Sequence, residues 1–148
     1  MCRGGTGRGR RHACCRLSQA IRTVVERLKP VVSAYSTDIV YTGAVGTAQA
    51  AKAANNLLMW ACLIANHEAL ALAQRFGVDV ELLRTALLKT GADNGVLRNW
   101  GTSTMAWADD DLDIIQSMAE DAGIALPQAE LNRELCRSAG KLRLTSMV

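Results

Sequence analysis

The chain has 148 residues, of which 49% are hydrophobic and 21% are charged, a composition too apolar for a disordered protein and sufficient for one domain with a buried core. Its 17 Lys and Arg side chains outnumber its 14 Asp and Glu side chains, but residues 1–30 alone carry a net charge of +7, so the remaining residues sum to −4. Aromatic residues make up only 4%, so the core must be built from Ala, Leu, Val and Ile, which favours close-packed helices over a sheet sandwich.

The sequence does not favour a membrane, secreted or disulfide-rich protein. The longest uninterrupted apolar run, residues 57–65, is far shorter than the roughly 20 residues of a membrane-spanning helix. No apolar segment follows the N-terminal arginines, as a secretory signal would require. The five cysteines are an odd set without C-x-x-C spacing. We therefore expect a cytoplasmic protein with no membrane partner and no disulfide scaffold.

Residues 1–16 are predicted to form a disordered basic arm, because they hold four glycines and five arginines without apolar periodicity. A short amphipathic helix is predicted next, with Ser18 as its N-cap and apolar residues at three- and four-residue steps up to Leu28. We expect Pro30 to interrupt this helix or to start a new turn. Residues 38–41 predict a brief extended segment that ends in a turn.

The dominant predicted element is a long helix over residues 47–76. This stretch lacks Pro and Gly, is rich in Ala, and stops before Gly77, the residue type best suited to the left-handed position after a helix. Its first half is apolar on nearly every face. Such a pattern predicts a helix that is enclosed, either by other helices of this chain or by a second copy.

Three shorter helices with recognisable ends follow, and they make the predicted fold class all-α. We expect one over residues 80–90 with Asp79 as N-cap, one over 109–122 with acidic residues in its first turn, and one from Pro127 to about residue 139. A glycine follows each of the three.

Lys52 is the only charged residue in the apolar first half of the long helix. Asn56 follows one helical turn later on the same face, and Asn55 and Gln49 add further amides. Polar groups on a buried helix need partners, which either a core network or a ligand with a carboxylate and a hydroxyl would supply. A lysine that loses its hydration has a lowered pKa and can transfer protons near neutral pH. The residues alone leave both interpretations open.

The segment around this lysine, GAVGTAQAAKAANN over residues 43–56, closely resembles the signature that opens the C-terminal domain of the β-hydroxyacid dehydrogenases, the family typified by 3-hydroxyisobutyrate dehydrogenase. In that family a glycine pair leads into a long helix with a catalytic lysine and, four residues later, an asparagine. Lys52 and Asn56 match these two positions. Residues 68–73 and 77–79 resemble the continuation of the same helix and its exit, and the resemblance runs from about residue 24 to about residue 140.

The resemblance implies oxidation of a short β-hydroxy acid by NAD or NADP, or reduction of its semialdehyde. Lys52 would be the catalytic residue that accepts the hydroxyl proton as hydride leaves the carbinol carbon, and its ammonium would stabilise a developing oxyanion. Asn56 would bind substrate by hydrogen bonding, with Asn55 as a second candidate. In related imine-reducing enzymes another residue generally replaces the lysine, so Lys52 favours the hydroxyacid branch.

Two features depart from the family pattern. The family binds its dinucleotide on an N-terminal Rossmann domain with a G-x-G-x-x-G turn, and nothing ahead of residue 24 resembles such a domain, since the glycine run at residues 5–9 lacks a preceding strand. Where family members commonly have a lysine near the cofactor, this chain has Asp110, which cannot donate to a cofactor amide or neutralise a phosphate. The cofactor-binding residues therefore stay unassigned.

We accordingly expect a basic arm over residues 1–16, the closing piece of a dinucleotide-binding domain over 17–42, and a helical C-terminal substrate and dimerisation domain over 43–148. Such a truncated or frame-shifted product would be inactive alone, and would act on a small hydroxy acid only when complemented by a Rossmann domain. A homodimer or higher oligomer is expected, because the long apolar helix would be exposed without that domain. The alternative is a non-catalytic helical dimerisation module.

Other features predict no further site. His12, Cys14 and Cys15 lack a fourth ligand, so no metal site is predicted. The basic arm has no recognition element beside it, so nucleic acid is not favoured as a partner. His67 is interpreted as a satisfied or surface histidine. The three tryptophans are interpreted as packing residues: Trp60, Trp100 and Trp107.

Overall fold

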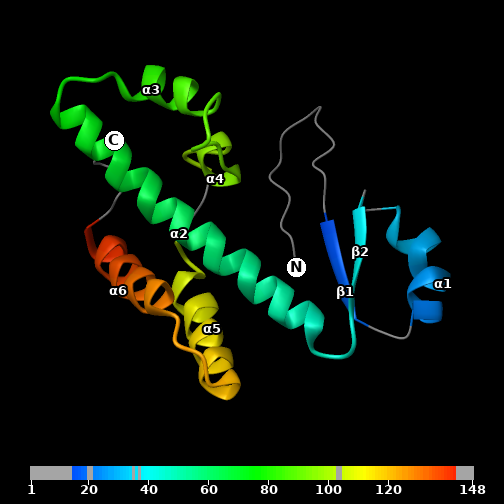
Figure 1. The fold of residues 1–148 in the computed structure, drawn as a ribbon. Coiled ribbons are helices and arrows are strands. Elements are labelled where there is room, and N and C mark those ends of the chain that lie inside the picture. The colour runs from blue at the N-terminus through cyan, green and yellow to red at the C-terminus, as the bar shows by residue number, and fades with distance from the viewer. Residues whose placement is uncertain (1–14, 20–21, 35, 37, 103–104, 143–148) are drawn as a thin grey trace. The chain divides into compact units, whose positions relative to one another are not determined.

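The structure, a computed structural model, describes residues 15–19, 22–34, 36, 38–102 and 105–142. The chain divides into two compact units, residues 1–52 and residues 53–148. The boundary falls inside helix α2 (Thr47–Arg75), which contributes residues to both units. The helices and strands of each unit are labelled in Figure 1.

The first unit contains two strands, β1 (Cys15–Gln19) and β2 (Asp38–Gly43), joined by helix α1 (Arg22–Val32). The strands are parallel, with Ser18 opposite Tyr41 and an irregularity after this pair. Parallel neighbours need a crossover connection, and α1 supplies it, so these elements form a βαβ unit. This is the mixed segment expected ahead of the helices. Its assignment to the end of a dinucleotide-binding domain stays a prediction.

The N-terminal boundary of this unit differs from the sequence-based expectation. Ser18 does not cap a helix but lies in β1, because pairing with β2 satisfies the main-chain groups that a helix would otherwise use. The predicted disordered arm over residues 1–16 overlaps this strand at its last two residues. The rest of the arm, residues 1–14, lies outside the described residues.

Helix α1 begins at Arg22 and continues through Pro30, so the expected interruption at this proline is wrong. A proline removes one donor from a helix, but the last turn survives here because Ser33 N donates to Lys29 O at 2.8 Å across it. Val25 is buried with 4% of its surface exposed, and α1 packs on β2.

Helix α2 confirms the long central helix. Its 29 residues correspond to about 43 Å at 1.5 Å per residue. It ends as predicted at Gly77, whose φ is +81°. Gly77 N donates to Gln74 O and Val78 N donates to Ala73 O, the paired Schellman bonds that a left-handed glycine permits.

Four further helices complete the second unit: α3 (Val80–Leu87), α4 (Gly95–Arg98), α5 (Ala108–Ala122) and α6 (Pro127–Leu142). Two predicted ends are confirmed. Asp79 caps α3, with its Oδ1 accepting from Leu82 N at 2.7 Å, and Gly123 ends α5 in the left-handed conformation. The all-α class of this part of the chain is confirmed.

Two helix ends and one additional helix differ from the expectation. Helix α3 ends at Leu87 rather than near residue 90, and α6 runs through Gly140, where a glycine weakens a helix without ending it. The four-residue helix α4 was not expected, because it is too short to show an apolar period. Asn94 begins it, with its side chain accepting from Leu97 N.

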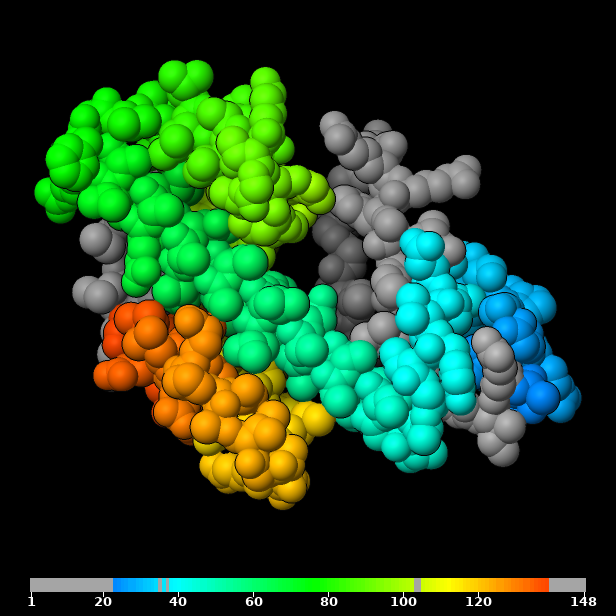
Figure 2. All heavy atoms as spheres, viewed as in Figure 1, coloured from blue at the N-terminus to red at the C-terminus, as the bar shows by residue number. Residues whose placement is uncertain are grey.

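The core of the second unit lies between α2, α5 and α6, which Figure 2 shows packed together in green, yellow and orange. The buried cluster consists of Trp60, Leu63, Ile64, Val96, Ala108, Leu112, Ile115, Ala129 and Cys136. Only part of α2 contributes side chains to this core, since Leu58 and Leu72 are 67% and 63% exposed. The expected enclosure of the first half of α2 by helices of this chain is therefore wrong for the described residues. Cover by a second copy stays a prediction.

By length and composition, α2 could also cross a membrane, contrary to the expectation from the apolar run alone. A core helix of a soluble protein passes the same test, and α2 buries Trp60, Leu63, Ile64 and Leu70. Length and composition therefore do not by themselves assign α2 to a membrane. No other helix among the described residues meets the criterion.

Cys136, on α6, is buried in this core with 3% of its surface exposed. Burial, and secondarily the carboxylate of Asp109, raise the pKa of the Cys136 thiol from 9.0 to about 11. The unfolded chain therefore loses this proton at a lower pH than the folded chain. The stabilising contribution is complete below pH 9 and is lost as the pH rises toward 11.

We expect this titration to remove on the order of 2 kcal/mol from the free energy of unfolding between pH 8.5 and pH 11, as measured by urea unfolding. Cys136→Ala should lack this component, whereas Cys62→Ala, at a half-buried cysteine, should retain it. The same pH dependence in wild type and Cys136→Ala would contradict the assignment.

Candidate active site

The candidate site begins at the turn between β2 and α2. Gly43 and Gly46 have φ angles of +122° and +98°, which residues with side chains rarely adopt. Thr47 Oγ1 donates to Ala44 O at 2.8 Å and lies 3.0 Å from Thr42 Oγ1, so this threonine fixes the turn at the start of the helix. The glycine pair leading into a long helix, which the resemblance implies, is present.

Lys52 and Asn56 lie one turn apart on α2, as their spacing predicts. Lys52, Asn55 and Gln49 are exposed and Asn56 is half-buried. Asn55 Nδ2 donates to Asn56 Oδ1 at 3.3 Å. Within the described residues this part of α2 is not enclosed, so the structure shows no burial that would dehydrate Lys52. The amine and the two amides are instead accessible to a ligand from solvent.

One turn beyond Asn56, Trp60 links α2 to α5. Its side chain is 3% exposed, and its Nε1 donates to Asp111 Oδ2 at 3.2 Å. The hydrogen bond holds the first turn of α5 against α2. Trp60 is a packing residue as predicted, but its polar partner was missed, because 51 positions separate the two residues and no local pattern connects them.

The first turn of α5 is acidic, as predicted, and most of these carboxylates have partners. Asp109 Oδ1 lies 2.9 Å from Arg137 Nε, and Asp111 accepts the hydrogen bond from Trp60. Beyond the first turn, Asp113 Oδ1 lies 2.5 Å from Arg133 Nε. Asp110 is exposed, at the position where the resemblance implies a lysine near the cofactor. A carboxylate at this place repels a pyrophosphate rather than binding it.

His67 lies on α2 and packs against Trp100, with ring centroids 4.5 Å apart and planes tilted by 50°. Burial lowers the pKa of His67 from its ordinary value, which favours the neutral imidazole. His67 is half-buried, and its Nδ1 has no hydrogen-bond partner among the described residues, so of the two interpretations, a satisfied or a surface histidine, the structure does not support the first. Trp100 packs on the core as expected, but Trp107, which precedes α5, is 60% exposed and does not.

The described residues contain no group of His, Cys, Asp and Glu side chains that could hold a metal ion. His12 and Cys14 lie outside the described residues, and Cys15 is described only as the first residue of β1. The expectation that His12, Cys14 and Cys15 form no metal site therefore stays a prediction.

Residues 46–146 match the protein family described as NAD-binding of NADP-dependent 3-hydroxyisobutyrate dehydrogenase. The chain belongs to this family. The matched segment includes Lys52, Asn55 and Asn56 and all of the helices of the second unit, so the resemblance identified from residues 43–56 is confirmed.

Individual proteins agree with this assignment. The mitochondrial 3-hydroxyisobutyrate dehydrogenase of Bos taurus is 34% identical over 84 residues, which cover 57% of this chain and 25% of that protein. A 3-hydroxyisobutyrate dehydrogenase from Salmonella typhimurium matches with a TM-score of 0.73 and 20% identity, over 85% of this chain and 47% of that one. The Mycobacterium tuberculosis enzyme, solved with L-serine, matches with a TM-score of 0.70 and 20% identity, over 82% and 48%.

These matches also define how much of a dehydrogenase this chain represents. It spans about a quarter of the bovine protein and about half of each solved structure. At 20% identity the solved structures establish a shared fold. The structural match covers more of this chain than residues 46–148 contain, so the shared fold extends into the βαβ unit.

The cofactor of the family is NAD(P), and the residues of this chain that would contact it are not assigned. No G-x-G-x-x-G turn joins β1 to α1 or β2 to α2. A Cβ added at Gly46 would meet no other atom of the described residues within 4 Å, so its positive φ, and not crowding by the protein, favours glycine at this position. Asp110 is an exposed carboxylate where the resemblance implies a lysine near the cofactor. The cofactor-binding residues therefore stay unassigned.

Proposed function

We propose that this chain is the C-terminal part of an NAD(P)-dependent oxidoreductase that oxidises a short β-hydroxy acid or reduces its semialdehyde, and that it is inactive alone. The observation that carries the proposal is the exposed Lys52 one turn before Asn56, inside the segment that matches the family. At this spacing an amine and an amide offer a proton acceptor and a hydrogen-bond donor to one small hydroxy acid.

Each side chain has a distinct part in the proposed reaction. In oxidation, the Lys52 amine accepts the substrate hydroxyl proton as the electrons of the neighbouring C–H bond leave as hydride. In reduction, the ammonium returns that proton to the carbonyl oxygen and stabilises the charge that develops there. Asn56 Nδ2 donates to a substrate oxygen, and Asn55 holds the Asn56 amide through its bond to Oδ1. Bound nicotinamide supplies the hydride acceptor.

The proposed substrate is a short acid with a hydroxyl on its β carbon. L-serine, with which the Mycobacterium tuberculosis relative was solved, is a molecule of this kind, since it carries a carboxylate and a β-hydroxyl. This supports the hydroxyacid class over an imine substrate, in line with a lysine at position 52.

The partner that this function requires is a Rossmann domain. Parallel sheets are normally covered on both faces, and a two-stranded sheet is seldom stable by itself, so the βαβ unit is small for an independent domain. We assign residues 17–42 to the end of a dinucleotide-binding domain and residues 43–148 to the substrate and dimerisation domain, behind a basic arm at 1–16. We propose a cytoplasmic location for this chain, whereas the bovine relative is mitochondrial.

A non-catalytic dimerisation module is the second candidate. It is favoured by large apolar side chains on and beside α2 that the described part of the chain leaves uncovered. Leu58 is 67% exposed, Phe76 81% and Leu82 70%. A second copy that covered them would bury apolar surface worth about 25 cal/mol per Å².

The deciding experiment compares the chain alone with a chimaera in which the Rossmann domain of the Salmonella typhimurium relative precedes β1. We expect the chain alone to bind neither NAD nor NADP by calorimetry and to oxidise none of a panel of β-hydroxy acids. The chimaera should oxidise at least one of them.

Turnover by the chain alone would contradict the statement that it is inactive alone. A folded chimaera that binds NAD(P) but turns over nothing would contradict the dehydrogenase proposal. If sedimentation then shows a dimer that Leu58→Asp dissociates, the dimerisation module is the supported function.

A further inference from the structure

The residue pair Asn94-Gly95 begins helix α4, and it is the only Asn-Gly pair in the sequence. In such pairs the main-chain nitrogen of the glycine can attack the side-chain carbonyl carbon of the asparagine, because glycine has no Cβ to obstruct the approach. The N–Cγ bond forms, the Cγ–Nδ2 bond breaks, and ammonia leaves a five-membered succinimide. Water then opens the ring at either carbonyl, giving aspartate or isoaspartate.

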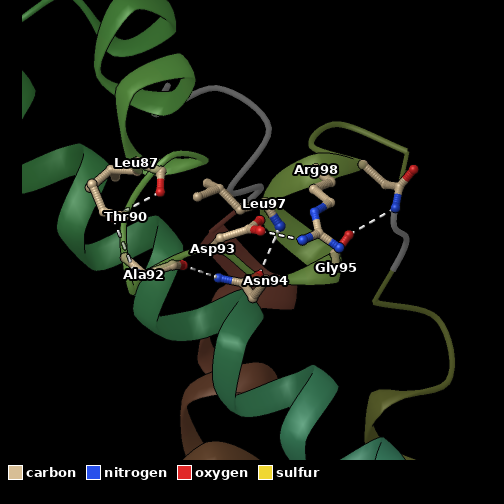
Figure 3. Close-up of polar contacts among 9 residues, drawn as sticks. Leu87, Thr90, Ala92, Asp93, Asn94, Gly95, Leu97 and Arg98 are labelled. Carbon is tan, nitrogen blue, oxygen red and sulfur yellow. Dashed lines mark hydrogen bonds and ion pairs between the residues drawn. The ribbon is translucent and has the colours of Figure 1, made fainter.

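The folded chain holds the Asn94 amide in four hydrogen bonds, of which Figure 3 shows the two to Leu97 and Ala92. Oδ1 accepts from Leu97 N at 2.9 Å and from Asn66 Nδ2 at 3.1 Å. Nδ2 donates to Ala92 O at 3.0 Å and to Asn66 Oδ1 at 3.1 Å. Ring closure makes the amide carbon tetrahedral and turns it toward the Gly95 nitrogen, so the amide must first leave these partners.

We propose that Asn94 is a latent modification site, at which spontaneous imide formation yields aspartate and isoaspartate at a rate set by the opening of the reciprocal Asn66–Asn94 amide pair. The site is independent of the proposed dehydrogenase function. The only co-reactant is water, and ammonia is the leaving group.

Either product weakens the attachment of α4. Aspartate keeps the oxygen that caps Leu97 N, but it has no N–H for Ala92 O or Asn66 Oδ1, and it places a second carboxylate beside Asp93. Isoaspartate adds a methylene to the main chain at the cap and moves the oxygen away from Leu97 N. Helix α4 carries Val96 and Leu97, which are buried with 7% and 1% of their surface exposed. Loss of the cap therefore weakens the packing of these two side chains.

The test follows deamidation of the full chain over time at mildly alkaline pH, by mass spectrometry of the tryptic peptide covering residues 90–98. We expect the folded chain to react at least about tenfold more slowly than the same chain in denaturant. Asn66→Ala, which removes both bonds of the amide pair, should react about tenfold faster than wild type while folded, a factor equivalent to about 1.4 kcal/mol.

Two further variants keep the test decisive. Gly95→Ala should slow formation of the product strongly in both conditions, because its Cβ obstructs the approach of the main-chain nitrogen. It should fold, because an added Cβ meets nothing within 4 Å and Gly95 has no left-handed φ. Asn66→Asp has the shape of asparagine and keeps an oxygen for Asn94 Nδ2, but it loses the donor to Asn94 Oδ1. It should therefore accelerate the reaction by less than about tenfold. This variant replaces Asn66→Ala in the test if the alanine variant does not fold.

Three results would overturn the proposal. Equal rates in the folded and denatured chain would show that the amide pair does not control the reaction. Absence of product in denaturant would show that Asn94 is not a site. An unchanged rate in Asn66→Asp, or in Asn66→Ala with native circular dichroism, would remove the role assigned to Asn66.

Discussion

In the chimaera that restores a Rossmann domain, Lys52→Ala is expected to lower kcat for β-hydroxy acid oxidation by about 10²- to 10⁴-fold, the range that a positioned proton acceptor supplies. The reason is that no other amine on the described first half of α2 can take the hydroxyl proton. Steady-state kinetics at saturating cofactor measure the effect. Binding of NAD(P) should be unchanged, because we assign no cofactor contact to Lys52.

Lys89→Ala is the matched control. Lys89 is also exposed, but it follows α3 rather than lying on α2, and its removal should leave kcat unchanged. Asn56→Ala should mainly raise KM, since its amide orients substrate without exchanging a proton. Equal kcat values for Lys52→Ala and Lys89→Ala would exclude Lys52 as the catalytic residue.

Trp60→Ala is expected to cost about 3 to 5 kcal/mol of unfolding free energy, because it empties the centre of the α2–α5–α6 core. The free energy of unfolding of a typical domain is only about 5 to 15 kcal/mol, so this variant should be close to unfolding. Trp60→Phe keeps most of the bulk and removes only the indole donor to Asp111, which should cost about 1 to 2 kcal/mol. Urea unfolding followed by far-ultraviolet circular dichroism measures both.

For this series the control is Trp107→Ala. Trp107 is 60% exposed, so its truncation should change the unfolding free energy by no more than about 0.5 kcal/mol. Equal losses of unfolding free energy in Trp60→Ala and Trp107→Ala would contradict the assignment of Trp60 to the buried core.

Helix ends were predictable from the sequence where short-range chemistry decides them. Gly77 and Gly123 end α2 and α5 through a left-handed backbone, and Asp79 caps α3 through its own carboxylate. Each depends only on residues a few positions away. Ser18 was misplaced because its partner Tyr41 lies on another strand, and a parallel pairing leaves no local trace in the sequence.

The candidate site divides in the same way. The spacing of Lys52 and Asn56 follows from the period of one helix and could be derived from the sequence, and the glycine turn before them carries a recognisable pattern. Their exposure could not be derived, because it depends on which distant segments cover α2. The same holds for the bond from Trp60 to Asp111 and for the amide pair of Asn66 and Asn94, which join residues 51 and 28 positions apart.

The ion pairs between α5 and α6 contribute little to stability at the surface, but they restrict how the two helices can slide along each other. In the observed alignment Asp109 and Asp113 face Arg137 and Arg133. Moving α6 by three residues would bring Glu134 and Glu130 to the positions of these arginines, so that acid would face acid along the whole seam. Like charges at close range are repulsive, so this charge pattern penalises the shifted alignment, as does the core, where Arg133 would replace the buried Cys136.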